Sequence, residues 1–380
     1  MIHLGQASID DLLEGFVAFR RLCPIDARLH AALPRQSPPA KDVDLAIPRK
    51  GSAAHAGAVA GMLRAARDID REEASRSLSH FLYIGDSAGT DGRAFASLCR
   101  VTGWSGRALI IDEDTQPPAS RCEAVGDGMI VHANRWAAIA AWVAEARSEG
   151  FGVDGRTVAI VDIDKTLIGA RGRNSAAIDA ARLRAALDVT ESVAGHCIDV
   201  DRFEATLRTL DQPAWHSLTA DNQDAVVYVA LIASLGVLTL EELASCPKIS
   251  AHGFAPYLAE VGKRQHLLPP GVRCLHHEVW KQVERGNPTP FVAFRRREYK
   301  ATREALACAS SVDTPKDMLE TGIVMTGEVW QAVREWKDRD VLVFGLSDKP
   351  DEACFPPPES FGEEDVPIHR IPMPIVGGSQ

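Results

Sequence analysis

Apolar and polar positions along this chain follow the pattern of an α/β protein. Short apolar runs predict strands at residues 43–47, 81–84, 107–111, 128–131, 157–161, 341–346 and 366–371. Apolar residues at helical spacing predict helices at 1–35, 52–66, 93–100, 134–147 and 326–336, with Ser52 as a helix N-cap. Strands and helices alternate in this way when helices cover a mainly parallel sheet, so we expect an α/β fold.

The middle of the chain departs from that alternation. From about residue 175 to residue 320, helical patterns dominate, for example at 177–187, 221–234, 253–263 and 299–309, and strand signals are scarce. A segment of about 150 residues is too long for a connecting loop. We therefore expect a helical domain inserted into the α/β core.

Charged and aromatic residues of this helical segment have two interpretations. Residues 295–297 form a basic cluster, and residues 221–224 form a polar one. Such runs usually lie on a solvated helix face, and substrate binding is the alternative. Trp215, Trp280 and Tyr228 are expected in the core.

Composition narrows the class of protein. The chain has 380 residues, enough for two domains, and a net charge of −10, which argues against a general nucleic-acid binder. The N-terminus lacks the pattern of a signal peptide, and no apolar run approaches the roughly 20 residues of a membrane span. Eight cysteines are scattered without a C-x-x-C pair, which is typical of reduced thiols. We expect a cytoplasmic protein without nucleic-acid or membrane partners.

Acidic and hydroxyl side chains follow two of the predicted strands. Asp162, Asp164 and Thr166 come directly after one of them, and carboxylates at positions i and i+2 can converge on one cation. Asp86 and Asp91 lie on the glycine-rich turn GDSAGTDG after another, which lacks the G-x-G-x-x-G fingerprint of dinucleotide binding. Open α/β sheets bind ligands at the carboxyl ends of their strands. Each segment taken alone also fits a solvated acidic turn or a helix cap.

Together these segments resemble the motifs of the haloacid dehalogenase-like (HAD) superfamily. TVAIVDIDKT at 157–166 is similar to the first motif, an apolar strand followed by D-x-D-x-T. VLVFGLS at 341–347 resembles the second, and YIGDSAGTD at 83–91 the fourth. The third motif is a lysine at the start of the helix before the fourth motif's strand, and Lys50 stands there. The order here is third, fourth, first, second, which implies a circular permutation of the family's core.

The resemblance implies a domain organisation as well. Family members carry a cap domain between the first and second motifs, where the helical segment of this chain falls. The implied fold is therefore a HAD-like, Rossmann-like parallel sheet, circularly permuted, with a mostly helical cap. The expected division is core at 1–168, cap at 169–322 and core again at 323–380.

By the same resemblance, the acids imply Mg²⁺-dependent phosphoryl chemistry. Asp162 would attack phosphorus and form an aspartyl-phosphate, and Asp164 would act as general acid and base. Asp162, the main-chain carbonyl of Asp164 and Asp86 would hold Mg²⁺. Asp91 would assist the metal or orient the lysine, and the hydroxyl of Thr166 would lie near the substrate.

Hydroxyl and basic side chains complete the implied site. Ser347 would donate to the transferring phosphoryl group, and Lys50 would neutralise charge on the nucleophile and the phosphate. Ser347 could instead cap its turn, Lys50 could be a solvated lysine at a helix start, and Lys349 is a rival for the same charge. Arg171 and Arg173 follow the catalytic loop closely enough to meet an anionic substrate, or else form a solvated basic run.

The resemblance thus implies a phosphatase for a small phosphorylated metabolite. Asp164 favours phosphate over carbon–halogen chemistry, because dehalogenases of the family lack this second acid. A phosphotransferase or phosphomutase of the same family is the nearest alternative, and a catalytically silent binding module is another. A methyltransferase interpretation of the glycine-rich turn leaves Asp162, Asp164 and Ser347 unexplained.

Overall fold

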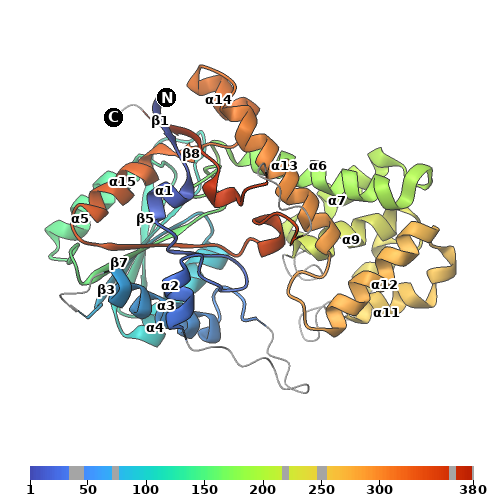
Figure 1. Ribbon diagram of the computed structural model, residues 1–380, viewed down its shortest axis with the longest axis horizontal. Coiled ribbons are helices and arrows are strands. Elements are labelled where there is room, and N and C mark those ends of the chain that lie inside the picture. Colours follow the sequence, from blue (N-terminus) through green and yellow to red (C-terminus); the bar gives the residue numbers. More distant parts are fainter. Residues whose placement is uncertain (34–46, 71–76, 216–221, 246–254, 359–364, 379–380) are drawn as a thin grey trace. The chain divides into compact units, whose positions relative to one another are not determined.

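A computed structural model describes residues 1–33, 47–70, 77–215, 222–245, 255–358 and 365–378 (Figure 1). The chain forms two compact units. The first contains both ends of the chain, within Met1–Ala40, Ile47–Ala180 and Thr302–Gln380, and the second consists mainly of Ala181–Ala301. Most of the predicted strand at 43–47 lies outside the described residues.

The first unit is built on a seven-stranded sheet with the order β2-β9-β7-β3-β4-β6-β5. In that order the strands are Val17–Ala18, Leu342–Leu346, Thr157–Asp162, His80–Gly85, Ser105–Ile111, Gly128–Ala133 and Ser120–Val125. All neighbouring strands are parallel except β5 and β6, which are antiparallel. The predicted α/β fold with a mainly parallel sheet is therefore confirmed.

Helices cover both faces of this sheet (Figure 1). α3 (Ala53–Asp70) and α4 (Arg93–Thr102) lie on one face, and α5 (Ala138–Ser148) and α15 (Gly327–Lys337) lie on the other. Ser52 caps α3 as predicted, because its hydroxyl accepts the His55 N–H at 3.2 Å. Among the described residues, no helix is long and apolar enough to cross a membrane.

Strand β7 is the centre of the site-bearing half of the sheet. All six of its residues are buried, because helices cover it on both faces and neighbouring strands flank it on both sides. It pairs with β3 on one side, where Val161 is opposite Ile84, and with β9 on the other, where Asp162 is opposite Leu346. The carboxyl ends of β3, β7 and β9 therefore lie together at one edge of the sheet.

The N-terminal segment differs from the single helix predicted over residues 1–35, which is wrong. It contains β1 (Ile2–Ala7), α1 (Ile9–Leu13), β2 and α2 (Ala27–Ala32). Ser8 caps α1, and Glu14 ends it in the left-handed conformation with φ 52°. The chain then enters the sheet, where β2 pairs with β9. The apolar residues that suggest one long helix in fact serve a short helix and an edge strand.

The C-terminal strand is also displaced from its prediction at 366–371, which is wrong. Ile368–Arg370 is a 3-10 turn, and the strand β10 is Met373–Gly377. Pro367 and Pro372 flank the turn and lack the N–H that a strand ladder needs. β10 lies between β1 and β8 (Met325–Thr326) in a separate three-stranded sheet.

The described residues of the second unit are helical, without a strand. Its helices are α6 (Ser175–Ala194, which begins in the first unit), α7 (Val200–Leu210), α9 (Gln223–Ser234), α10 (Leu240–Ser245), α11 (Ala255–Lys263), α12 (Pro270–Glu284) and α13 (Val292–Ala309, which ends in the first unit). Tyr228 is fully buried in this unit, as expected, whereas Trp215 and Trp280 are half-buried.

The boundaries of this unit lie inside the expected limits of 169 and 322. Residues 169–180 and 302–322, which include α14 (Pro315–Thr321), belong to the first unit. Asn174 shows why. Its amide donates to the carbonyls of Leu319 and Gly322 at 2.7 and 2.9 Å, and it accepts the Val324 N–H at 3.1 Å. These bonds hold the two ends of the insertion against the core.

Candidate active site at the carboxyl edge of the sheet

Three acids from two strand ends meet at this edge. Asp162 is the last residue of β7, and Asp86 and Asp91 follow β3. One carboxylate oxygen from each of the three lies within 4.8 Å of the others. Segments more than 70 residues apart in the chain, at Asp91 and Asp162, are thereby brought together as the sequence predicts.

Asp91 is fully engaged by the protein. Its Oδ2 accepts the two main-chain N–H groups that follow Gly85, both at 3.0 Å, and its Oδ1 accepts the Tyr83 hydroxyl at 3.0 Å. Its Oδ1 also lies 2.5 Å from Lys50 Nζ. Gly85 makes room for this side chain, because a Cβ there would lie 2.5 Å from Asp91 Cγ. This arrangement favours the orienting role for Asp91 over the metal-binding one.

Lys50 lies between two of the acids. Its Nζ is 2.6 Å from Asp162 Oδ1 and 2.5 Å from Asp91 Oδ1, and the residue is only 8% exposed. The solvated-lysine interpretation is therefore wrong. Burial alone would lower the pKa of Lys50, but the carboxylates of Asp162 and Asp91 outweigh it and raise this pKa well above its ordinary value. Lys50 thus carries its charge directly against the predicted nucleophile.

The acidic charge nevertheless exceeds the basic charge around it. Burial and the nearby Asp91 and Asp86 raise the pKa of Asp162 well above its ordinary value, against the effect of Lys50. Burial and Asp91 also raise the pKa of Asp86 to about 6, although Arg171 Nε donates to its Oδ2 at 2.6 Å. Three carboxylates face two cations here.

One buried oxygen in this group has no hydrogen-bond partner among the residues that the structure describes. It is Oδ2 of Asp162, a residue that is 4% exposed. Buried polar atoms are almost always paired, so an exception calls for an explanation. A hard divalent cation explains both the unpaired oxygen and the surplus of acidic charge, since Mg²⁺ prefers carboxylate oxygens. The residues present therefore fit such an ion.

The loop after β7 turns sharply and supplies the second acid. Lys165 has φ 65°, and the Leu167 N–H donates to the Asp162 carbonyl at 3.1 Å. Asp164 Oδ1 lies 3.4 Å from Lys349 Nζ. Thr166 is fully buried, and its hydroxyl has no hydrogen-bond partner among the described residues, so the predicted substrate contact stays a prediction.

Ser347 and Lys349 come from the loop after β9. Ser347 is 3% exposed, and its hydroxyl accepts the Lys349 N–H at 3.1 Å. The turn-capping alternative is thus present, but the cap uses the oxygen as acceptor and leaves the hydroxyl its own proton to donate. The two lysines offered as rivals by the sequence contact different acids: Lys50 contacts Asp162, and Lys349 contacts Asp164.

The two arginines predicted near the substrate differ in position. Arg171 reaches Asp86 and keeps 35% of its side chain exposed. Arg173 donates to both carboxylate oxygens of Glu113, at 3.0 and 2.9 Å, and to Glu328 at 2.9 Å. These bonds employ all three guanidinium nitrogens. Arg171 therefore belongs to the site, whereas Arg173 is held by Glu113 and Glu328 and is not available to bind a substrate.

The sequence analysis assigns no role to two residues of the site. Tyr83 holds Asp91, and its signal is a hydroxyl inside an otherwise apolar strand, which needs a buried partner. Arg20 is 8% exposed and follows β2. Its signal is the charged pair Arg20-Arg21 directly after an apolar run, the same pattern that marks the other strand ends.

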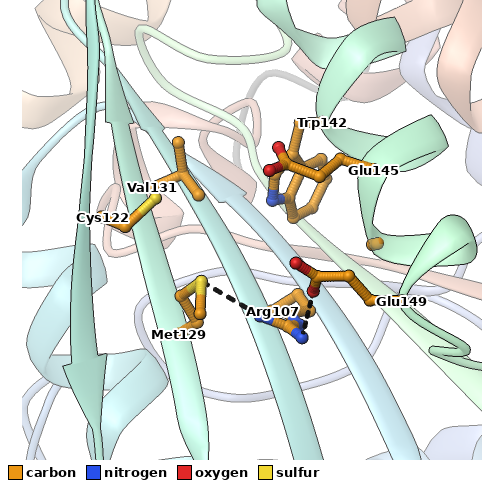
Figure 2. Close-up of a pocket in the computed structure, with 8 residues that line it drawn as sticks. Arg107, Cys122, Met129, Val131, Trp142, Glu145 and Glu149 are labelled. Carbon is orange, nitrogen blue, oxygen red and sulfur yellow. Dashed lines mark hydrogen bonds and ion pairs between the residues drawn. The ribbon is translucent and has the colours of Figure 1, made fainter.

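Figure 2 shows a small hollow beside the same sheet, and none of the candidate-site acids lines it. Its volume is about 20 Å³, little more than a water molecule needs. Arg107 crosses it and donates to Met129 Sδ at 3.0 Å and to Glu149 at 2.6 Å. This hollow is too small for a metabolite.

The helical unit contains a buried ion cluster of its own. Arg295 is 5% exposed and donates to Asp224 Oδ2 from two nitrogens, at 3.0 and 2.7 Å, and to Glu298 at 2.6 Å. The Phe291 N–H donates to the other Asp224 oxygen, and Arg182 donates to the other Glu298 oxygen. Arg295 is therefore neither a solvated cation nor a free anion-binding group.

Comparison of the chain with family models, with curated proteins and with solved structures finds no match in any of the three.

Proposed function

We propose that the first unit is a Mg²⁺-dependent phosphatase that works through an aspartyl-phosphate. The observation that carries this proposal is the position of Asp162, Asp86 and Asp91 around one point, with Lys50 against the nucleophile and one Asp162 oxygen left unpaired. Phosphoryl transfer requires a positioned nucleophile and neutralised charge on the phosphoryl oxygens, and these groups supply both.

The proposed reaction has two steps. A carboxylate oxygen of Asp162 attacks phosphorus, the bond from phosphorus to the ester oxygen breaks, and Asp164 gives its proton to that leaving oxygen. Asp164 then takes a proton from water, and the resulting hydroxide displaces the phosphate from Asp162. Lys349, 3.4 Å from Asp164, holds this acid in place, and Ser347 donates to the phosphoryl group.

Asp162 and Asp86, with the main-chain carbonyl of Asp164, would hold the metal. When bound by these groups, Mg²⁺ supplies positive charge that keeps Asp162 ionised and offsets the charge of the phosphoryl oxygens. Asp91 would keep Lys50 in place, since its own oxygens are already engaged.

The sheet order supports the HAD-like interpretation. The strands that carry the fourth, first and second motifs are β3, β7 and β9, and β7 pairs with both of the others. Adjacent strands let the three motifs act together whatever their order in the chain, which is what a circular permutation requires. By the same resemblance, the helical unit would be a cap that selects the substrate.

A panel of phosphate esters assayed with Mg²⁺ tests the proposal. The wild-type protein should release phosphate from at least one small ester, and Asp162→Asn should not. Asp68→Asn, on an exposed position of α3, is the matched control and should behave like wild type. Release of phosphate by Asp162→Asn at the wild-type rate would contradict the mechanism.

A phosphotransferase would use the same Asp162 intermediate and is the second candidate. The observation that keeps it open is the burial of Asp162 at 4% exposure, because an excluded site can protect an aspartyl-phosphate from water. Transfer of phosphate to an added alcohol, in preference to water, would favour the transferase. Inertness across the whole panel would favour a binding module.

A further inference from the structure

Arg20 uses its whole guanidinium group to join two loops. Nη1 donates to the carbonyl of Pro48 at 3.0 Å, and Nη2 donates to the carbonyl of Ile47 at 3.2 Å. Nε lies 3.4 Å from Asp348 Oδ1. The main-chain N–H of Arg20 donates to the Lys349 carbonyl at 3.1 Å. No nitrogen of this side chain is left to water or to the apolar core.

These contacts lie next to both lysines of the site. Pro48 is two residues before Lys50, and Asp348 directly precedes Lys349. The ammonium groups of these lysines lie 2.6 Å from Asp162 and 3.4 Å from Asp164. A shift of either loop would therefore move a cation relative to a reacting carboxylate, and misplacement by about 1 Å can cost about 100-fold in rate.

We infer that Arg20 is a positioning residue that fixes Lys50 and Lys349 together for phosphoryl transfer. This inference rests on the proposed phosphatase function for its kinetic consequence, but the clamp itself is independent of it. A planar guanidinium can donate to two successive carbonyls and a carboxylate at once, whereas an ammonium on a shorter stem cannot span them. Arg20→Lys keeps the charge and removes the span.

Arg67 supplies a matched control within the same unit. It is 4% exposed, like Arg20 it donates to main-chain carbonyls, and its acceptors include Thr157 at 3.4 Å and Asp340 at 3.2 Å. Thr157 begins β7 and Asp340 precedes β9, so these contacts lie at the opposite ends of the strands that carry the site. Arg67→Lys should weaken buried hydrogen bonds to main-chain carbonyls without moving Lys50 or Lys349.

Two measurements on full-length Arg20→Lys and Arg67→Lys test the inference. The first is kcat and KM on the best ester of the panel. Arg20→Lys should lower kcat by about 10-fold to 100-fold and change KM by less than about threefold, while Arg67→Lys should leave kcat within about twofold. The second is deuterium exchange of peptides covering residues 47–52 and 346–350. Arg20→Lys should accelerate exchange in both peptides, and Arg67→Lys in neither.

Every result of these two measurements either supports or overturns the positioning role of Arg20. Unchanged exchange in both peptides, or an unchanged kcat in an active Arg20→Lys protein, would overturn the positioning role. Equal losses of kcat in the two variants would also overturn it, because a general loss of packing would then explain the effect. If the wild-type protein hydrolyses no ester, faster exchange confined to the Arg20 variant would support the clamp while the phosphatase function fails.

Discussion

The two units of this chain each bury a cluster of ion pairs. The clusters differ in how many of their carboxylate oxygens have a hydrogen-bond partner. In the helical unit, both oxygens of Asp224 and both oxygens of Glu298 accept hydrogen bonds, and two acids face the two cations Arg295 and Arg182. At the sheet edge, within the described part of the chain, three acids face two cations, and one oxygen of Asp162 has no partner.

We expect this difference to separate a cluster with a structural role from one with the proposed chemical role. A buried ion pair is tolerated when every donor and acceptor is matched, and removing one partner then strands the other. A cluster with an unmatched acid is destabilised until something else binds to it. The Asp224 cluster should therefore matter for folding, and the Asp162 cluster should matter for binding and catalysis.

The largest effect is expected at Asp162. Asp162→Asn should lower kcat by on the order of 10⁴-fold, because the proposed nucleophile is lost while the proposed binding groups remain. Its free energy of unfolding should stay equal or rise, since one of three crowded carboxylates is neutralised. Steady-state kinetics with Mg²⁺ measures kcat, and urea unfolding without Mg²⁺ measures the free energy of unfolding. A large loss of stability would mean that Asp162 is as structural as Asp224.

Asp224→Asn should show the reverse behaviour. Its free energy of unfolding should fall by about 3–5 kcal/mol, because Arg295 would become a buried charge without full compensation. Urea unfolding followed by circular dichroism measures the change. Asp201→Asn, at an exposed position on α7, is the control and should stay close to wild type. An unaffected Asp224→Asn protein would remove the distinction between the two clusters.

Added Mg²⁺ should stabilise the protein through the incomplete cluster alone. A ligand that binds only the folded state at about a hundredfold excess over its Kd adds about 2.7 kcal/mol. Thermal unfolding with and without Mg²⁺ should show this shift in the wild-type protein and in Asp201→Asn. The shift should vanish in Asp162→Asn. An equal shift in Asp162→Asn would place the ion elsewhere.

The sequence predicts the incomplete cluster better than its surroundings, for physical reasons. The strands before Asp162, Asp86 and Ser347 are apolar runs of strand length, and acids or a hydroxyl at their ends are local signals. Lys50 follows from the family resemblance, and the structure places it between two of the acids. These features depend on short segments that each carry their own pattern.

The remaining features depend on tertiary contacts that no short segment displays. β2 has only two residues, and its pairing with β9 makes it a strand. β5 was not predicted because its sequence SRCEAV is largely polar and exposed, and among the described strands β6 alone pairs with it. Arg171 and Arg173 look equivalent in GARGRN, yet one reaches Asp86 and the other reaches Glu113.

The smallest effect is expected on the pH dependence of stability, from one buried histidine in each unit. Burial lowers the pKa of His369 in the first unit and of His276 in the second to about 4. Neither ring nitrogen of His369 has a hydrogen-bond partner in the described ranges, whereas Nδ1 of His276 lies 2.6 Å from the Tyr228 hydroxyl. Each folded-state pKa is below the unfolded value near 6.5, so unfolding takes up protons between these values.

Stability should therefore be fully present above about pH 6.5 and fall as the pH is lowered toward 4. Each histidine should contribute a loss of about 1 kcal/mol between pH 7 and pH 5, after allowance for solvent screening. His369→Phe should remove part of this loss, because Phe19 and Phe355 already surround the ring and the unpaired nitrogens disappear. His3→Phe, at an exposed position, should leave the pH dependence unchanged. If His369→Phe unfolds with the wild-type pH dependence, burial of His369 does not contribute to that dependence. Missing hydrogen bonds would then be a weaker sign of function elsewhere in this unit.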